Sequence, residues 1–152
     1  MPDSITVQLN GHKDVVAAFR DLRDYLPKTA LRSSVRAAAQ FLQNFIVSIA
    51  PVGNPTVDPF SGRLRKNITV QTHATSSTIR GRVVVNTQGK RNNPSNAFYW
   101  RFLEKGFRDR SGKFHSYPFV RSVFDSKNRE AAQTVIDSVE KAIDRAEAKA
   151  KG

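Results

Sequence analysis

The longest periodic segment of the sequence follows Pro27 and constrains the fold more than any other feature. Its apolar residues step by four and three: Leu31, Val35, Ala38, Leu42, Phe45 and Ile49. Over about 22 residues this period predicts about 33 Å of α-helix. Ala50-Pro51 ends the helix, because the residue before a proline disfavours the helical backbone. The single apolar stripe has to be buried against a second layer of structure.

Alternating apolar and polar residues predict the strands of that second layer. The first strand carries Ile5, Val7 and Leu9. Two later strands are separated by a polar stretch at 73–77, which predicts a hairpin. The apolar residues of this hairpin, which we expect on its inner face, are Ile68, Val70, Ile79, Val83 and Val85.

Two further helices complete the predicted fold. One covers about 13–26, and the other follows Asp125 before it fades into a polar C-terminal tail. The apolar stripe of the latter is Ala132, Ile136, Val139 and Ile143. The prediction is one α+β domain over 1–152, with an antiparallel sheet of three to four strands packed by two to three helices, one of them long. Pro/Gly-rich and Asn-rich stretches predict flexible loops at about 51–63 and 87–96.

Aromatic residues concentrate in the stretch 97–124. It holds the only tryptophan, two of the three tyrosines and six of the ten phenylalanines, so it should dominate either the core or an interface. Glu104 is embedded there and needs a partner or an open edge, since an unpaired buried carboxylate is costly. Gly106 indicates a sharp turn with a positive φ. Periodicity leaves open whether the aromatic residues before it form a strand or a helical turn.

The net charge of +12 is distributed unevenly. Eleven Lys and Arg residues lie between Lys28 and Arg101, against the single acid Asp58. A block this one-sided favours a polyanion or an acidic protein surface as partner. Alternation places two arginines of the last strand on one face of the hairpin. The candidate contacts for DNA or an acidic partner are Arg65, Arg80, Arg82, Lys90 and Arg91.

Four motifs in order carry a resemblance to a known family. They are Ala50-Pro51, Ser61-Gly62-Arg63-Leu64-Arg65-Lys66-Asn67-Ile68, Tyr99…Phe102-Leu103-Glu104-Lys105-Gly106 and Pro118-Phe119-Val120-Arg121. In this order the chain resembles the tail-completion or head–tail joining family of long-tailed bacteriophages, roughly over 7–143. Phe107 stands where that family usually has a small hydroxyl residue, and Ser122-Val123 where it often has proline and alanine.

The resemblance implies a structural protein of the virion neck or tail, assembled in the host cytoplasm. It implies a homo-oligomeric ring, with six subunits the expected number, between the portal or adaptor proteins and the tail terminator or tail tube. The Pro-Phe-x-Arg element is expected to open the last helix. The implied interface or motif residues are Tyr99, Trp100, Phe102, Glu104, Gly106, Pro118, Phe119 and Arg121. Within this set we expect the Glu104 carboxylate to pair with the Arg121 guanidinium.

No catalytic constellation can be built from the sequence. His12, His73 and His115 fall in expected loops or turns without ligand-like spacing, and no glycine-rich phosphate loop is present. We therefore expect no enzyme activity, cofactor, metal site or membrane span. Two functions stay open: a structural assembly module, or a nucleic-acid-binding module that uses the basic residues on DNA phosphates and aromatic rings for base stacking. DNA that crosses the ring makes the two compatible.

Overall fold

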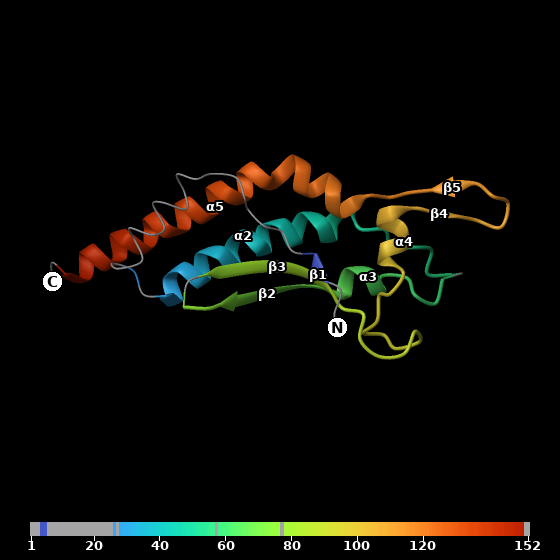
Figure 1. Ribbon diagram of the computed structural model, residues 1–152, viewed down its shortest axis with the longest axis horizontal. Helices are drawn as coiled ribbons and strands as arrows, with labels where there is room; N and C mark the ends of the chain where they lie inside the picture. Colours follow the sequence, from blue (N-terminus) through green and yellow to red (C-terminus); the bar gives the residue numbers. More distant parts are fainter. Residues whose placement is uncertain (1–3, 6–25, 27, 57, 77, 151–152) are drawn as a thin grey trace.

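Three layers make up the body of the molecule (Figure 1). The computed structural model describes residues 4–5, 26, 28–56, 58–76 and 78–150. Helix α2 (Lys28–Ile49) lies between helix α5 (Phe119–Ala150) and a three-stranded sheet. The predicted α+β class is confirmed, and the helices cover one face of the sheet.

The sheet is antiparallel, with strand order β1-β3-β2. It consists of β1 (Ser4–Ile5), β2 (Ile68–Ala74) and β3 (Ile79–Val85). The hairpin prediction is confirmed, but the strands run further than expected, so the turn lies at 75–78 and closes with a 2.8 Å hydrogen bond from Thr75 N–H to the Thr78 carbonyl. The predicted helix at 13–26, apart from Leu26, and the later part of the first predicted strand lie outside the described residues.

Helix α2 has the predicted length, but its buried stripe differs from the prediction at the C-terminal end. Ile46 is 2% exposed, whereas Ile49 is 49% exposed. The buried face of α2 is wide because the helix packs against both α5 and the sheet. Small residues lie where a neighbouring element approaches closely. At Gly81 of β3, an added Cβ would lie 3.0 Å from Val35 Cγ1 and 3.1 Å from Ala39 Cβ. This glycine therefore lets the strand approach the helix closely.

Helix α5 begins earlier than the apolar period indicates. It starts at Phe119 and not after Asp125, so the Pro-Phe-x-Arg element does open it, as the resemblance implies. Of its predicted stripe, Val139 is buried and Ile143 packs partly buried against the core, whereas Ala131 and Val135 are buried in place of the half-buried Ala132 and Ile136. The apolar periodicity of this alanine-rich, charged helix is weak, so its sequence fits either of two neighbouring stripes about equally well.

Strand β2 forms one edge of the sheet, and side chains of α2 cover part of that edge. Gln43 Nε2 donates a 2.8 Å hydrogen bond to the Ile68 carbonyl. The Arg32 guanidinium donates to the Thr72 hydroxyl at 3.3 Å and to the Thr72 carbonyl at 3.4 Å. Because unpaired edge carbonyls invite another strand, these contacts protect part of the edge against unspecific pairing.

The remaining elements gather at one end of the molecule (Figure 1). They are α3 (Arg63–Lys66), α4 (Trp100–Lys105), β4 (Phe107–Arg108) and β5 (Phe114–His115). Helix α3 precedes β2 and places the fully buried Leu64 in the core. The aromatic residues before Gly106 thus form the short helix α4, so of the two alternatives left open by the sequence, a strand or a helical turn, the helical turn is the one observed.

Both predicted loops carry internal hydrogen bonds. In 51–63, Gly62 N–H donates to the Val52 carbonyl at 2.9 Å. In 87–96, Asn96 Nδ2 donates to the Gly89 carbonyl at 2.8 Å, and Asn67 Nδ2 donates to the Pro94 carbonyl at 2.8 Å. These bonds connect described parts of both loops, and the flexibility of the loops in solution stays a prediction.

Candidate functional site

Gly106 ends α4 and permits the chain to turn into the β4–β5 hairpin. Its N–H donates a 2.8 Å hydrogen bond to the Phe102 carbonyl, and its φ is +93°. The predicted positive φ is thus confirmed. A Cβ at this position would clash with the Phe114 ring and lie 3.1 Å from the His115 carbonyl oxygen. The hairpin folds back so closely over this residue that only glycine fits without displacement.

Glu104 joins α4 to the start of α5. Its Oε2 accepts a 3.0 Å hydrogen bond from Val120 N–H, and its Oε1 accepts a 2.9 Å bond from Arg121 N–H. The carboxylate thus contacts the main chain of Arg121. The expected pair with the Arg121 guanidinium is wrong, since the charged group caps a helix N-terminus, where its negative charge also suits the helix dipole.

All four N–H groups of the first turn of α5 have partners. Phe119 N–H donates to the Tyr117 carbonyl at 2.8 Å, and Ser122 N–H donates to the Pro118 carbonyl at 3.0 Å. The Glu104 carboxylate accepts hydrogen bonds from the two N–H groups between them, those of Val120 and Arg121. A further 2.8 Å bond from Tyr117 N–H to the Leu103 carbonyl closes the base of the hairpin. The predicted motifs around Glu104 and Pro118 therefore meet in space and fix the hairpin to the helical body.

Asp109 organises the tip of the hairpin. Its Oδ1 accepts bonds from the Ser111 hydroxyl at 2.6 Å, from Ser111 N–H at 2.9 Å and from Lys113 N–H at 3.0 Å. Its Oδ2 lies 2.8 Å from His115 Nε2. The Ser111 hydroxyl, followed by His115, lowers the pKa of the Asp109 carboxyl from its ordinary 3.8 to about 2. An ionised Asp109 therefore holds the turn.

The lowered pKa of Asp109 predicts that the hairpin loses stability at low pH. A carboxyl whose pKa is lowered by folding stabilises the folded form above its ordinary pKa, and that contribution is lost as the pH falls from about 4 to about 2. The ¹³C chemical shift of the Asp109 carboxyl should titrate at about 2. In a Ser111→Ala variant, which lacks the strongest of these bonds, the midpoint should rise. A midpoint near 3.8 in the wild-type chain would contradict the network.

The aromatic residues of this end divide into buried and exposed groups. Trp100 and Phe119 are 7% and 4% exposed and belong to the core, so Trp100 cannot stack on a base. Tyr99 is half-buried; its hydroxyl donates to the Phe60 carbonyl at 3.4 Å, and burial is the main cause of its raised pKa. The large side chains that face solvent here form what we call the aromatic end: Phe102, Phe107, Phe114 and Tyr117.

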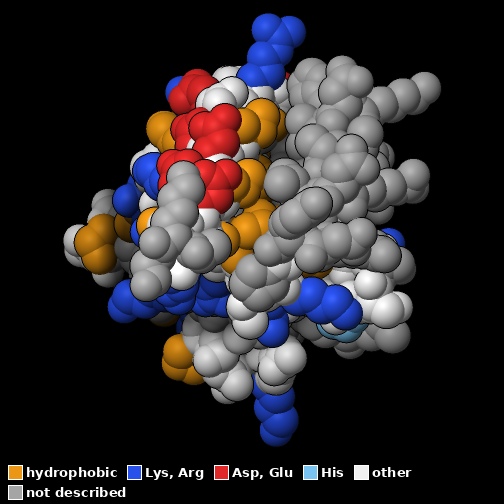
Figure 2. Space-filling view, turned by 90° about the vertical axis from the view of Figure 1, so that its left-hand side faces the viewer, with side chains coloured by type: hydrophobic (Ala, Val, Ile, Leu, Met, Phe, Trp, Pro, Cys, Tyr) orange, Lys and Arg blue, Asp and Glu red, His pale blue; other side chains and the backbone are white. Residues whose placement is uncertain are grey.

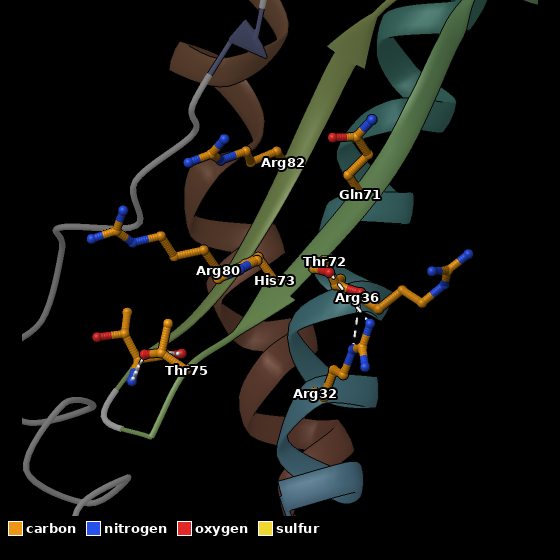
Figure 3. Close-up of a pocket in the computed structure, with 9 residues that line it drawn as sticks. Arg32, Arg36, Gln71, Thr72, His73, Thr75, Arg80 and Arg82 are labelled. Carbon is orange, nitrogen blue, oxygen red and sulfur yellow. Dashed lines mark hydrogen bonds between the residues drawn. The ribbon is translucent and has the colours of Figure 1, made fainter. Parts of the chain in front are cut away.

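A second candidate site is a hollow of about 640 Å³ at the β2 edge, which we call the arginine groove. Its lining consists of Arg32, Arg36, Gln71, Thr72, His73, Thr75, Thr78, Arg80 and Arg82. Figure 3 shows the arginines of β3 and those of α2 on either side of the β2–β3 ribbon. The register opposes Arg82 to Gln71 and Arg80 to His73, which confirms that these two arginines share a face.

The arginine groove has excess positive charge. Within the described part of the chain, no carboxylate pairs with any of its four guanidinium groups. Among the described residues, Arg32 is the one guanidinium of the four that donates to a neighbour, and Arg82 Nε is buried without a hydrogen-bond partner there. Like charges that line one hollow repel one another, so the groove favours an anion.

The other predicted basic contacts lie elsewhere. Arg65 donates from Nε to the Ala50 carbonyl at 2.9 Å and from Nη2 to the Ser48 carbonyl at 3.0 Å, so it caps the C-terminus of α2. The Arg91 guanidinium lies 5.3 Å from the centre of the Phe98 ring, and Lys90 is exposed in the same loop. The five predicted residues thus do not form one surface.

Comparison with known families decides the identity of the chain. The family model described as "Bacteriophage HK97-gp10, putative tail-component" matches residues 13–106, well over half of the sequence. The chain belongs to this HK97-gp10-like family. Comparisons with curated proteins and with solved structures found no match.

The HK97-gp10-like match supports the resemblance inferred from the motifs. The residues at which the match begins and ends show which structural elements it includes. It includes α2, the β2–β3 hairpin, α4 and Gly106, and it ends before the β4–β5 hairpin. The Pro-Phe-x-Arg element, which meets Glu104 in space, lies beyond the match. A member of this family is a phage structural protein of the tail, which agrees with the coarser part of the sequence prediction.

Sequence reasoning missed several residues of both sites. Asp109, followed by Ser111-Gly112, has the residue types of an Asx turn, a local signal that could have revealed the hairpin tip. Arg32 and Arg36 are cations near the N-terminus of α2, where the helix dipole disfavours positive charge, and only the tertiary structure brings them to the arginine groove. In the described part of the chain, no three His, Asp or Glu residues are grouped to hold a metal, and no helix is long and apolar enough to cross a membrane.

Proposed function

We propose that this HK97-gp10-like protein assembles into a ring at the head–tail junction and joins the portal or adaptor proteins to the tail terminator or tail tube. Its role is structural and involves no catalysis or cofactor. Family membership supports a tail component. The aromatic end is the observation that carries the more specific role, because it presents a surface suited to another virion protein.

The exposure of the aromatic end is unusual for a free surface. Phe102, Phe114 and Tyr117 are 55%, 56% and 52% exposed, and Phe107 is 37% exposed. Large aromatic side chains at one end of a small protein favour burial against a partner, and they are typical anchors at interfaces. The hairpin that carries two of them is fixed by Asp109 at its tip and by Glu104 at its base, so little order has to be gained on binding.

Particle assembly tests this proposal. Phage that lack the chain should accumulate DNA-filled heads and separate tails, and the purified wild-type protein should join them in extracts, as seen by electron microscopy. The double variant Phe102→Ser/Phe114→Ser should reduce joined particles at least about tenfold. Its melting should change little, since both side chains are exposed.

The matched control is Phe102→Tyr/Phe114→Tyr, which keeps both rings and should retain most of the joining activity. Normal particles in the absence of the chain would refute the proposed function. Full joining by the serine variant would show instead that the aromatic end is not the contact surface.

DNA binding is a second candidate function, favoured by the arginine groove alone. Its four arginines have no carboxylate partner among the described residues, and guanidinium groups suit phosphate oxygens. Binding of about four phosphates by these arginines should weaken roughly a hundredfold between 50 and 200 mM salt. Fluorescence anisotropy with duplex DNA at several salt concentrations measures this slope.

A further inference from the structure

Helix α5 carries an acidic strip on its solvent side. We give this name to the exposed residues Glu130, Asp137, Glu140, Asp144 and Glu147. Their spacings of seven, three, four and three residues place them on one side of the helix. The buried residues Ala131, Val135 and Val139 occupy the opposite side, against α2. Figure 2, viewed towards the C-terminal end of α5, shows these acidic side chains gathered together.

Most of the strip is not neutralised within the described part of the chain. Glu130 pairs with Lys127 at 2.7 Å, and Asp137 accepts a bond from Gln133 at 2.8 Å. Glu140, Asp144 and Glu147 form no ion pair with another described residue. The described part of the chain thus leaves carboxylates of α5 without a cationic partner, although the net charge of the sequence is +12.

The acidic strip and the arginine groove lie on opposite sides of α2. Helix α5 covers one side of α2, and the sheet that carries the groove covers the other (Figure 1). One chain therefore cannot bring its own strip into its own groove. Two copies can do so, because each offers what the other needs.

We propose that the arginine groove of one copy binds the acidic strip of a second copy. This contact is heterologous: a different surface of each subunit takes part, and the second copy keeps a free groove for a third. When each copy binds the next through the same contact, the copies form a ring, provided that the rotation from one copy to the next returns the last copy to the first. The inference rests on the ring in the proposed function and specifies which surfaces form it.

The spacing of the charges fits this arrangement. Arg32 and Arg36 are one helical turn apart, about 6 Å along the axis, and Arg80 and Arg82 are about 7 Å apart along the strand. Glu140 and Asp144 are also separated by about 6 Å along α5. Successive acidic residues of the strip are therefore spaced along their backbone much as successive arginines of the groove are, and Arg and carboxylate form strong directional hydrogen bonds.

A copy of the same chain suits the groove better than DNA does. The lining has no Phe, Tyr or Trp on which a base could stack, and its one aromatic ring is the smaller imidazole of His73. The acidic strip, in contrast, is present at the same concentration as the groove and needs no other molecule.

Charge reversal tests this contact. The groove variant is Arg80→Glu/Arg82→Glu, and the strip variant is Glu140→Lys/Asp144→Lys. Each variant alone should lose self-association at least about tenfold in sedimentation velocity at 50 mM salt, because like charges then face each other. A one-to-one mixture of the two should associate again, since each reversed surface meets a complementary one. Circular dichroism checks that both variants are folded.

The control for net charge is Lys66→Glu/Lys113→Glu, which changes two exposed cations outside the groove and should leave association unchanged. If the wild type associates and neither reversal weakens it, this interface is wrong while the proposed ring stands. Absence of wild-type self-association would also overturn the inference, and the head–tail joining assay would still test the proposed function separately. Loss of duplex DNA binding in the groove variant, with self-association intact, would assign the groove to nucleic acid.

Discussion

Replacing Ile46 with alanine is expected to lower the free energy of unfolding by about 2–4 kcal/mol, whereas Ile49→Ala should lower it by less than about 1 kcal/mol. Ile46 is 2% exposed and belongs to the core cluster with Leu64 and Val83. Its truncation leaves a cavity between α2 and its neighbours that a close-packed core cannot fill. Ile49 is 49% exposed, so its truncation removes little buried surface.

Urea denaturation of the wild type and of both variants measures this difference. The dependence of the unfolding free energy on urea should stay constant, which would show that the variants change stability and not the extent of unfolding. Equal losses for the two substitutions would contradict the orientation of α2, because both isoleucines lie in its last turn and differ mainly in the direction they face.

The same pair of residues shows what periodicity can and cannot predict. The pattern predicted the existence, length and end of α2, because an apolar period over 22 residues and the Ala50-Pro51 stop are local signals. It did not predict that α5 and the sheet contact α2 on two sides. Burial of Ser34 and Ala39 follows from those contacts, and small residues of this kind give no apolar signal in the sequence.

The candidate sites were predictable to different degrees. Strand alternation placed Arg80 and Arg82 on one face, since a strand has a period of two. Their meeting with the arginines of α2 depends on how the helix crosses the sheet, about which the sequence carries no local signal. Arg65 lies outside the arginine groove and donates to the carbonyls of Ser48 and Ala50, a position that became visible only in the fold; its predicted contact with DNA or an acidic partner stays a prediction.

Glu104→Ala is expected to lower the free energy of unfolding by about 2–3 kcal/mol. The carboxylate accepts two main-chain hydrogen bonds at the start of α5, and its removal leaves both donors without these partners. Loss of a helix cap costs about 0.5–2 kcal/mol, and the charge and the second bond add to that. Glu104→Gln keeps one acceptor and should lose about half as much. Arg121→Met should cost less than about 0.5 kcal/mol, since Glu104 contacts only the main chain of this exposed residue.

A double-mutant cycle on Glu104→Ala and Arg121→Met separates the main-chain contact from a side-chain ion pair. Because Met keeps its N–H, the two losses should add to within about 0.5 kcal/mol. Amide hydrogen exchange should become faster at Val120 and Arg121 in Glu104→Ala and remain unchanged in Arg121→Met. A coupling well above 1 kcal/mol with unchanged exchange would instead make the guanidinium the partner. In that case the base of the hairpin would depend on an ion pair, which salt weakens. If the losses add, the base of the hairpin depends on the hydrogen bonds from Glu104 to the start of α5, which hold the aromatic end in place at the ionic strength of the cell.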